Sequence, residues 1–157
     1  MLSQQQQQRI WQISDTVLYN EAPAFLHQFI RDKGGQPLPS AQMNGLLSVA
    51  KSSQYVELEQ FIKHQRDRNW LASKIFIKTF YTELERVFTM MRSKRIREEF
   101  RLLSPDLTIS QMQQQANEVM AYLAYDFIQH LEAENRLLDA QNQDQRFQNR
   151  QQQTQKR

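Results

Sequence analysis

The chain of 157 residues contains no cysteine. Disulfides, thiolate nucleophiles and cysteine-ligated zinc are therefore excluded, and the absence is typical of a protein in a reducing compartment. Only three glycines and four prolines are present, and four of these seven residues lie within positions 34–39. A chain this poor in helix breakers, and rich in Gln, Leu, Glu, Arg and Ala, is predicted to be all-α.

Long apolar runs are also missing. No run approaches the about 20 residues that a membrane-spanning helix needs. The N-terminal Met-Leu-Ser, followed by Gln4 to Gln8, lacks the basic and apolar regions of a signal peptide. We therefore expect a soluble, cytoplasmic protein with no membrane partner. Its length fits one domain, with or without tails.

Apolar residues recur at spacings of three and four through most of the chain, which is the period of helices that bury one face. We expect a bundle of five to six helices. The first helix covers residues 7–32, with a kink or break near Asn20 or Glu21 caused by Pro23. A short helix capped by Ser40 follows. The remaining helices are predicted over 55–68 and 73–91, over 92–103 as a short basic helix, and as a long last helix.

The last helix has the clearest start signal in the chain, because Thr108 and Gln111 form the pattern of a capping box. It is predicted to extend to about Ala140, a length of about 45 Å. Beyond it Gln, Asn, Asp and Arg dominate, so residues 141–157 are predicted to be a disordered, glutamine-rich tail. Residues 1–140 would then form a single helical domain.

Charge is distributed unevenly along the chain. Residues 63–101 carry eleven Lys and Arg against five acids, whereas residues 102–140 carry one base and six acids. The net charge of +3 hides this difference. On a helical protein such a layout indicates one surface for a polyanion and another for a neighbouring protein.

The basic segment contains two clusters of candidate nucleic-acid-binding residues. The first consists of Lys63, Arg66 and Arg68, and the second of Arg92, Lys94, Arg95 and Arg97. A stripe of Lys and Arg can follow a nucleic-acid backbone without reading bases. Alternatively, these residues form a solvated face with intrahelical ion pairs, such as Arg95 with Glu98 or Glu99. Nucleic-acid binding requires the two clusters to share a surface, which spacing along the chain does not determine.

No pattern of an active site is present. The three histidines (His27, His64 and His130) fall on three different predicted helices and lack the spacing of a metal site. Gly34 and Gly35 lack the preceding strand and the further glycine and lysine of a phosphate-binding loop. We therefore predict no catalytic residue, no metal, no cofactor and no enzymatic activity.

Two segments resemble a known family. Residues 38–51 (LPSAQMNGLLSVAK) look like the motif that opens a core helix in the small helical subunits of type III CRISPR effector complexes. In that family a Thr or Ser caps the helix, followed closely by Gln, an apolar residue, often Arg, and two apolar residues; Asn44 stands where Arg is frequent. Residues 61–68 (FIKHQRDR) are similar to the basic helix end that follows in cyanobacterial-type members.

The resemblance implies an RNA-binding scaffold subunit of a ribonucleoprotein complex for antiviral defence. It would stack in several copies and contact the guide–target duplex through its phosphates. Its partners would be RNA, as a duplex or a single strand, other subunits of the complex, and further copies of itself. Lys51, Lys63, Arg66 and Arg68 lie in the matching region. The cluster at Arg92, Lys94, Arg95 and Arg97 is nominated by charge alone.

Two other functions remain open. A helical protein–protein adaptor would bind a partner helix in an exposed apolar groove. A DNA-binding regulator would use residues 43–50 and 55–65 as a helix-turn-helix. The second of these segments carries its positive charge at its C-terminal end, whereas base contacts usually come from the N-terminal part of a recognition helix.

Overall fold

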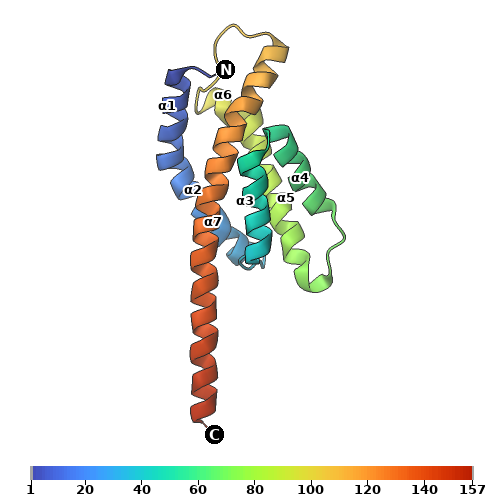
Figure 1. Ribbon diagram of the computed structural model, residues 1–157, viewed down its shortest axis with the longest axis vertical. Helices are drawn as coiled ribbons and strands as arrows, with labels where there is room; N and C mark the ends of the chain where they lie inside the picture. Colours follow the sequence, from blue (N-terminus) through green and yellow to red (C-terminus); the bar gives the residue numbers. More distant parts are fainter. Residues whose placement is uncertain (1, 157) are drawn as a thin grey trace.

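The computed structural model describes residues 2–156, and within that range it contains helices and connecting segments but no strand (Figure 1). The predicted all-α class and the long C-terminal helix are confirmed. The α-helices are α1 (Gln4–Ile13), α2 (Tyr19–Asp32), α3 (Ser40–Ser52), α4 (Tyr55–Asp67), α5 (Ile75–Met90), α6 (Ile96–Glu98) and α7 (Ile109–Gln155); two π turns, η1 (Ser14–Leu18) and η3 (Met91–Arg95), and one 3₁₀ turn, η2 (Ala72–Lys74), complete the set.

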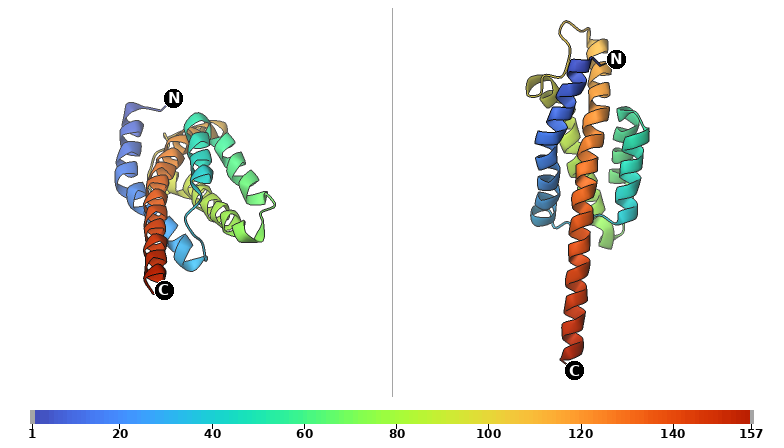
Figure 2. Two further views of the ribbon diagram at one scale, coloured as in Figure 1. Left: turned by 60° about the horizontal axis from the view of Figure 1, so that its bottom comes forward. Right: turned by 60° about the vertical axis from the view of Figure 1, so that its left-hand side comes forward.

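Helix α7 is the central element of the fold. It begins at the predicted capping box: the Gln111 N–H donates to Thr108 Oγ1 at 3.1 Å, and the Thr108 N–H donates to Gln111 Oε1 at 3.0 Å. Helices α1 and α2 lie on one side of α7, and α3 and α4 lie on the other (Figure 2). Every helix of the bundle therefore takes its position from α7 or from a neighbour that packs on it.

Helices α1 and α2 join through η1 without an interruption, so the predicted break into two helices near Asn20 or Glu21 is wrong; the helix axis bends where α1 passes into α2 (Figure 1). The irregular turn lies earlier, at Ser14–Leu18, and Pro23 is inside α2. The buried residues Ile13 and Leu18 are five positions apart. A π turn places residues five apart on one side, where a regular α-helix would rotate one of them away from the core.

The same reason explains the second π turn. Helix α5 continues through η3 into α6, so the separate helix predicted over 92–103 is wrong, and α6 ends at Glu98. The buried residues Met91 and Ile96 are again five positions apart. The extra residue of η3 keeps both in the core and leaves the charged residues between them outside.

The connector between α2 and α3 is tightly defined. Gly34 has φ of +64°, a conformation that favours glycine. A Cβ at Gly35 would collide with the ring of Phe29. Helix α3 then begins at Ser40 with Pro39 in the capping position, and no side chain caps it. The predicted cap at Ser40 is therefore displaced by one residue.

The core forms one cluster of buried apolar residues that extends from Leu2 to Leu131. Aromatic rings connect three of the helices that contribute to it. Phe25 of α2 packs edge-on against Phe80 of α5 and Phe127 of α7, with ring centroids 5.8 and 5.9 Å apart, and Phe88 packs against Phe127 at 5.5 Å. These contacts join α2, α5 and α7, the three longest helices. Large rings bury more apolar area than aliphatic side chains, so the contacts contribute strongly to the packing.

Beyond the bundle, α7 continues as a single projecting helix (Figures 1 and 2). Residues 141–157 were expected to be disordered from their composition, but the structure continues them as helix as far as Gln155, and Arg157 lies outside the described residues. Gln and Arg are good helix formers, and extending an existing helix fixes one residue per added hydrogen bond. Every residue from Ala140 to Lys156 is exposed, so the core does not stabilise this segment.

Among the described residues, no helix combines the length and apolar character required to cross a membrane.

Candidate nucleic-acid interface

The structure brings part of the two predicted basic clusters onto one surface. Two shallow hollows adjoin η3: one of about 370 Å³ lies between α5 and the end of α4, and one of about 210 Å³ lies between η3, α6 and the start of α7. Ser93 lines both, so the hollows adjoin. Their charged lining consists of Arg66, Glu85 and Arg86 in the first hollow and of Arg92 and Arg97 in the second. We call the surface formed by Arg66, Arg86, Arg92 and Arg97 around Ser93 the arginine face.

At one end of the arginine face, Arg66 is engaged in ion pairs. Its guanidinium donates to both carboxylate oxygens of Asp67, at 2.9 and 3.0 Å, and also pairs with Glu85. The hydrogen bonds from Arg66 lower the pKa of Asp67. Lys63 lies three residues earlier on the same side of α4 and pairs with Glu59 at 3.0 Å. The first cluster is therefore largely neutralised within the chain.

At the other end of the arginine face, the arginines form fewer and longer ion pairs with carboxylates. Arg92 Nε donates to Asn117 Oδ1 of α7 at 2.8 Å, which fixes its position without cancelling its charge. Arg97 donates to the Ser93 carbonyl at 3.3 Å and lies 3.9 Å from Glu98, and its side chain is 55% exposed. Lys94, between them, is exposed. This end keeps the stronger positive charge.

Arg95 is not part of the arginine face. Its guanidinium forms a two-pronged ion pair with Glu21 of α2, at 2.7 and 2.8 Å, and donates to Glu99 through Nε at 2.7 Å. The guanidinium carbon also lies 4.7 Å from the centre of the Phe100 ring. These hydrogen bonds raise the pKa of Arg95. Here the intrahelical pairing with Glu99, the alternative to nucleic-acid binding, is present.

The remaining predicted residues line neither hollow. Lys51 is exposed near the end of α3, and Arg68 follows α4 and lies over the Trp70 ring at 4.7 Å. Of the eight predicted residues, the structure therefore brings three to the arginine face (Arg66, Arg92 and Arg97). It adds Arg86, which the prediction omitted. The spacing of Arg86, Met90, Ser93 and Arg97, alternately four and three, was the sequence signal for it.

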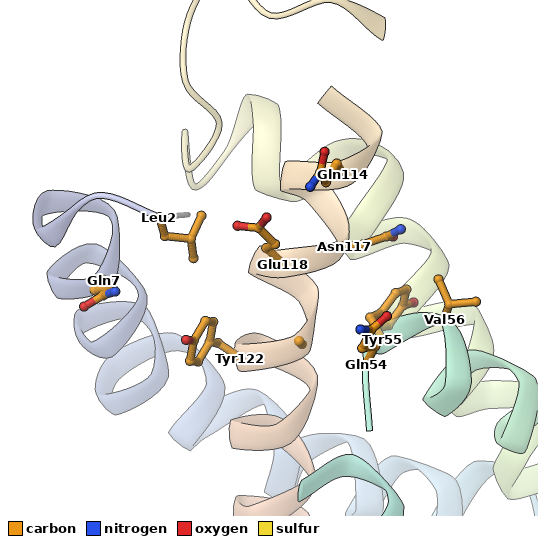
Figure 3. Close-up of a pocket in the computed structure, with 10 residues that line it drawn as sticks. Leu2, Gln7, Gln54, Tyr55, Val56, Gln114, Asn117, Glu118 and Tyr122 are labelled. Carbon is orange, nitrogen blue, oxygen red and sulfur yellow. The ribbon is translucent and has the colours of Figure 1, made fainter. Parts of the chain in front are cut away.

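A second surface feature is an apolar groove of about 510 Å³ (Figure 3). Leu2 and Gln7 lie on one side of α7 and Gln54 to Val56 on the other, with Tyr122 of α7 between them. Tyr122 is 49% exposed, whereas Tyr55 is buried and burial raises the pKa of its hydroxyl. Asn117 lines the groove as well as holding Arg92, so the groove adjoins the arginine face.

A serine, an aspartate and a histidine also meet where η1 packs on α7. His130 Nε2 lies 3.4 Å from Ser14 Oγ and 3.2 Å from the Ser14 carbonyl oxygen, and burial raises the pKa of Asp126 nearby. Ser14 is itself buried. These contacts join η1 to α7. Because the Ser14 hydroxyl is buried, a substrate has no access to it. Within residues 2–156, no group of three or more His, Asp or Glu side chains is arranged to hold a metal.

Neither a family model, nor a curated protein, nor a solved structure matches this chain. Residues 38–51, on which the resemblance was based, form the end of the connector and most of α3. Its apolar residues Met43 and Leu46 are buried in the bundle, so packing within this chain accounts for them.

The helix-turn-helix alternative would place α4 in a DNA groove. The first turns of α4 are acidic, with Glu57 exposed and Glu59 paired to Lys63. Tyr55 and Leu58 of the same segment are buried in the core. An acidic N-terminal half is repelled by phosphates, so this geometry does not favour DNA recognition by α4.

Proposed function

We propose that the protein is a non-enzymatic RNA-binding subunit of a ribonucleoprotein complex, and that it contacts the RNA backbone through the arginine face. One observation carries the proposal: four arginines from α4, α5, η3 and α6 line two adjoining hollows that contain a single carboxylate, Glu85. Such an arrangement suits phosphate, because guanidinium groups donate paired, charge-assisted hydrogen bonds to phosphate oxygens.

The donors at the arginine face differ in availability. Arg86 is 67% exposed and uses only Nη1 to pair with Glu83. A guanidinium has five N–H donors, so Arg86 and Arg97 keep several for a ligand. Arg66 and Arg92 are more buried, and their own hydrogen bonds orient them. Binding would be electrostatic and independent of base sequence.

Membership of a CRISPR-type effector complex rests on the resemblance of residues 38–51 and 61–68 and is part of the proposal. The predicted acidic surface for a protein neighbour is weaker than composition suggests. Glu132 pairs with Arg136 and Glu134 with His27, so both acids are engaged inside the chain. Contacts with neighbouring subunits would use the apolar groove instead.

The proposal is tested by fluorescence anisotropy with a labelled single-stranded RNA of about 40 nucleotides over a range of salt concentrations. The affinity of the wild-type protein should fall steeply with salt, and R86Q/R97Q should reduce the slope of log affinity against log salt by about 1.4, or about 0.7 for each phosphate that is no longer neutralised. R31Q/K74Q removes two exposed charges away from both hollows and should leave the slope unchanged.

Absence of RNA binding at low salt would contradict the proposal, as would equal effects of the two double variants. In that case the adaptor alternative would be favoured. The observation behind that alternative is the apolar groove, in which Val56 and Tyr122 face solvent beside Leu2.

A further inference from the structure

We propose that the projecting end of α7, residues 145–156, is a second binding site for nucleic-acid phosphates. We call this segment the α7 projection. The inference rests on the proposed function for the class of ligand but uses a different site. It therefore depends on residues that are not part of the arginine face.

The charge of the α7 projection is uncompensated. Arg146, Arg150 and Lys156 follow the last acid of the chain, Asp144. None of these three cations forms an ion pair within the described residues, whereas Lys63, Arg66, Arg86 and Arg95 of the bundle all do. An exposed cation without a carboxylate partner gives up no internal pair when it binds phosphate. The projection therefore offers its full charge to a polyanion.

The placement of these side chains also suits a backbone ligand. Arg146 and Arg150 are four residues apart, so they share one side of the helix about 6 Å apart along its axis. Phe147 is 62% exposed beside them and offers a ring on which an unpaired base can stack. Because the segment extends beyond the bundle, a ligand can approach it from all sides (Figure 2).

Other ligands fit the α7 projection poorly. A helix that lies on a membrane needs a broad apolar face, and a coiled coil needs apolar residues at two positions of every heptad. Phe147 is the only large apolar residue in the segment, and Gln and Asn fill most of the remaining positions. Their amides can donate to and accept from phosphate, sugar and base edges. Composition and exposure together therefore favour a nucleic acid.

The two sites are far apart. Ala116 lines the second hollow, and Arg146 lies thirty residues further along the same helix, which corresponds to about 45 Å. A single RNA molecule must therefore be long to reach both sites. Two sites on one ligand raise the overall affinity without any new contact at either site.

The test is the anisotropy titration with an RNA of about 40 nucleotides, applied to R146Q/R150Q, R86Q/R97Q, the combined variant and the control R31Q/K74Q. Glutamine keeps the helix-forming tendency of the segment, and circular dichroism checks that helix content is retained. We expect R146Q/R150Q to lower the salt slope by about 1.4 and the combined variant by about 2.8, with the control unchanged.

The outcomes separate the two proposals. If R146Q/R150Q binds as the wild type does while R86Q/R97Q weakens binding, the second site is overturned and the arginine face stands. If R146Q/R150Q alone weakens binding, the arginine face is overturned and the second site stands. If the wild-type protein does not bind RNA, or if the control weakens binding as much, both are overturned.

Discussion

The side-chain amide of Asn135 binds both backbone groups of Leu38. Asn135 Oδ1 accepts from the Leu38 N–H at 2.8 Å, and Asn135 Nδ2 donates to the Leu38 carbonyl at 3.0 Å. Asn135 is only 3% exposed and Leu38 is fully buried. The pair ties the connector between α2 and α3 to α7 and satisfies a stretch of backbone that has no secondary structure of its own.

Replacement of Asn135 by alanine should therefore destabilise the protein by about 2–4 kcal/mol, because it leaves a buried N–H and a buried C=O without partners. Chemical denaturation measures the change in the free energy of unfolding. Asn142→Ala, at an exposed position of the same helix, is the matched control and should change stability by less than about 0.5 kcal/mol. Equal effects of the two substitutions would contradict the role of Asn135.

Arg95 and Arg97 are two residues apart but should behave in opposite ways. Arg95 is 19% exposed and holds α2 through Glu21, so Arg95→Gln should cost about 1–2 kcal/mol of stability and leave RNA affinity unchanged. Arg97→Gln should leave stability unchanged and weaken RNA binding. Thermal denaturation and anisotropy on both variants check this. Loss of RNA binding in Arg95→Gln, with stability retained, would place Arg95 at the interface.

The Asp126 carboxyl should make part of the stability depend on pH. Burial raises its pKa and the nearby Asp15 adds to this, while the hydrogen bond from Ser14 and the charge of His130 oppose it. Because the folded-state pKa is the higher one, the folded state binds the proton more tightly. This contribution to stability is fully present below the unfolded pKa of about 3.9 and is lost as pH rises through the folded-state pKa.

Asp126→Asn removes this contribution. The variant should gain stability relative to the wild type as pH rises from about 4 to about 7, as measured by urea denaturation at each pH. The comparison variant is Asp144→Asn, which makes the same substitution on the exposed part of α7. A constant difference for Asp126→Asn would show that its carboxyl is not desolvated.

The part of α7 beyond the bundle should open more easily than the part inside it. Residues 141–155 lack core contacts, whereas Val119, Leu123 and Phe127 are buried. A helix without packing is only marginally stable in water. Backbone amides of 141–155 should therefore exchange within the fastest class and those of 119–131 in the slowest, by hydrogen exchange. Equal protection along α7 would mean that a partner covers the projecting part.

Local patterns made much of the fold predictable. The capping box at Thr108 and Gln111 lies within four residues, and the apolar periods of α4, α5 and α7 are continuous, so sequence located them well. The π turns were missed because a buried spacing of five, as from Met91 to Ile96, departs from the helical period only once. The spacing of five between these two apolar residues can nevertheless be read from the sequence.

The surface was less predictable, because its charges are cancelled by partners distant in sequence. Glu21 reaches Arg95 across 74 positions, and Glu85 reaches Arg66 across 19. Charge along the chain therefore indicated a basic segment but not which of its side chains pair within the chain. Arg86, Arg92 and Arg97 form a common surface only through the packing of α5, η3 and α6.

The two π turns have a consequence for the length of the chain. Each contains one residue more than a regular turn, and this residue is accommodated locally. If Ser93 were deleted, Met91 and Ile96 would be four positions apart, and an ordinary α-helix would still bury both. The register downstream, including α7, would be kept. We therefore expect the bundle to tolerate the deletion of one residue in η1 or in η3, whereas a deletion inside a regular buried helix would rotate the residues that follow it out of the core.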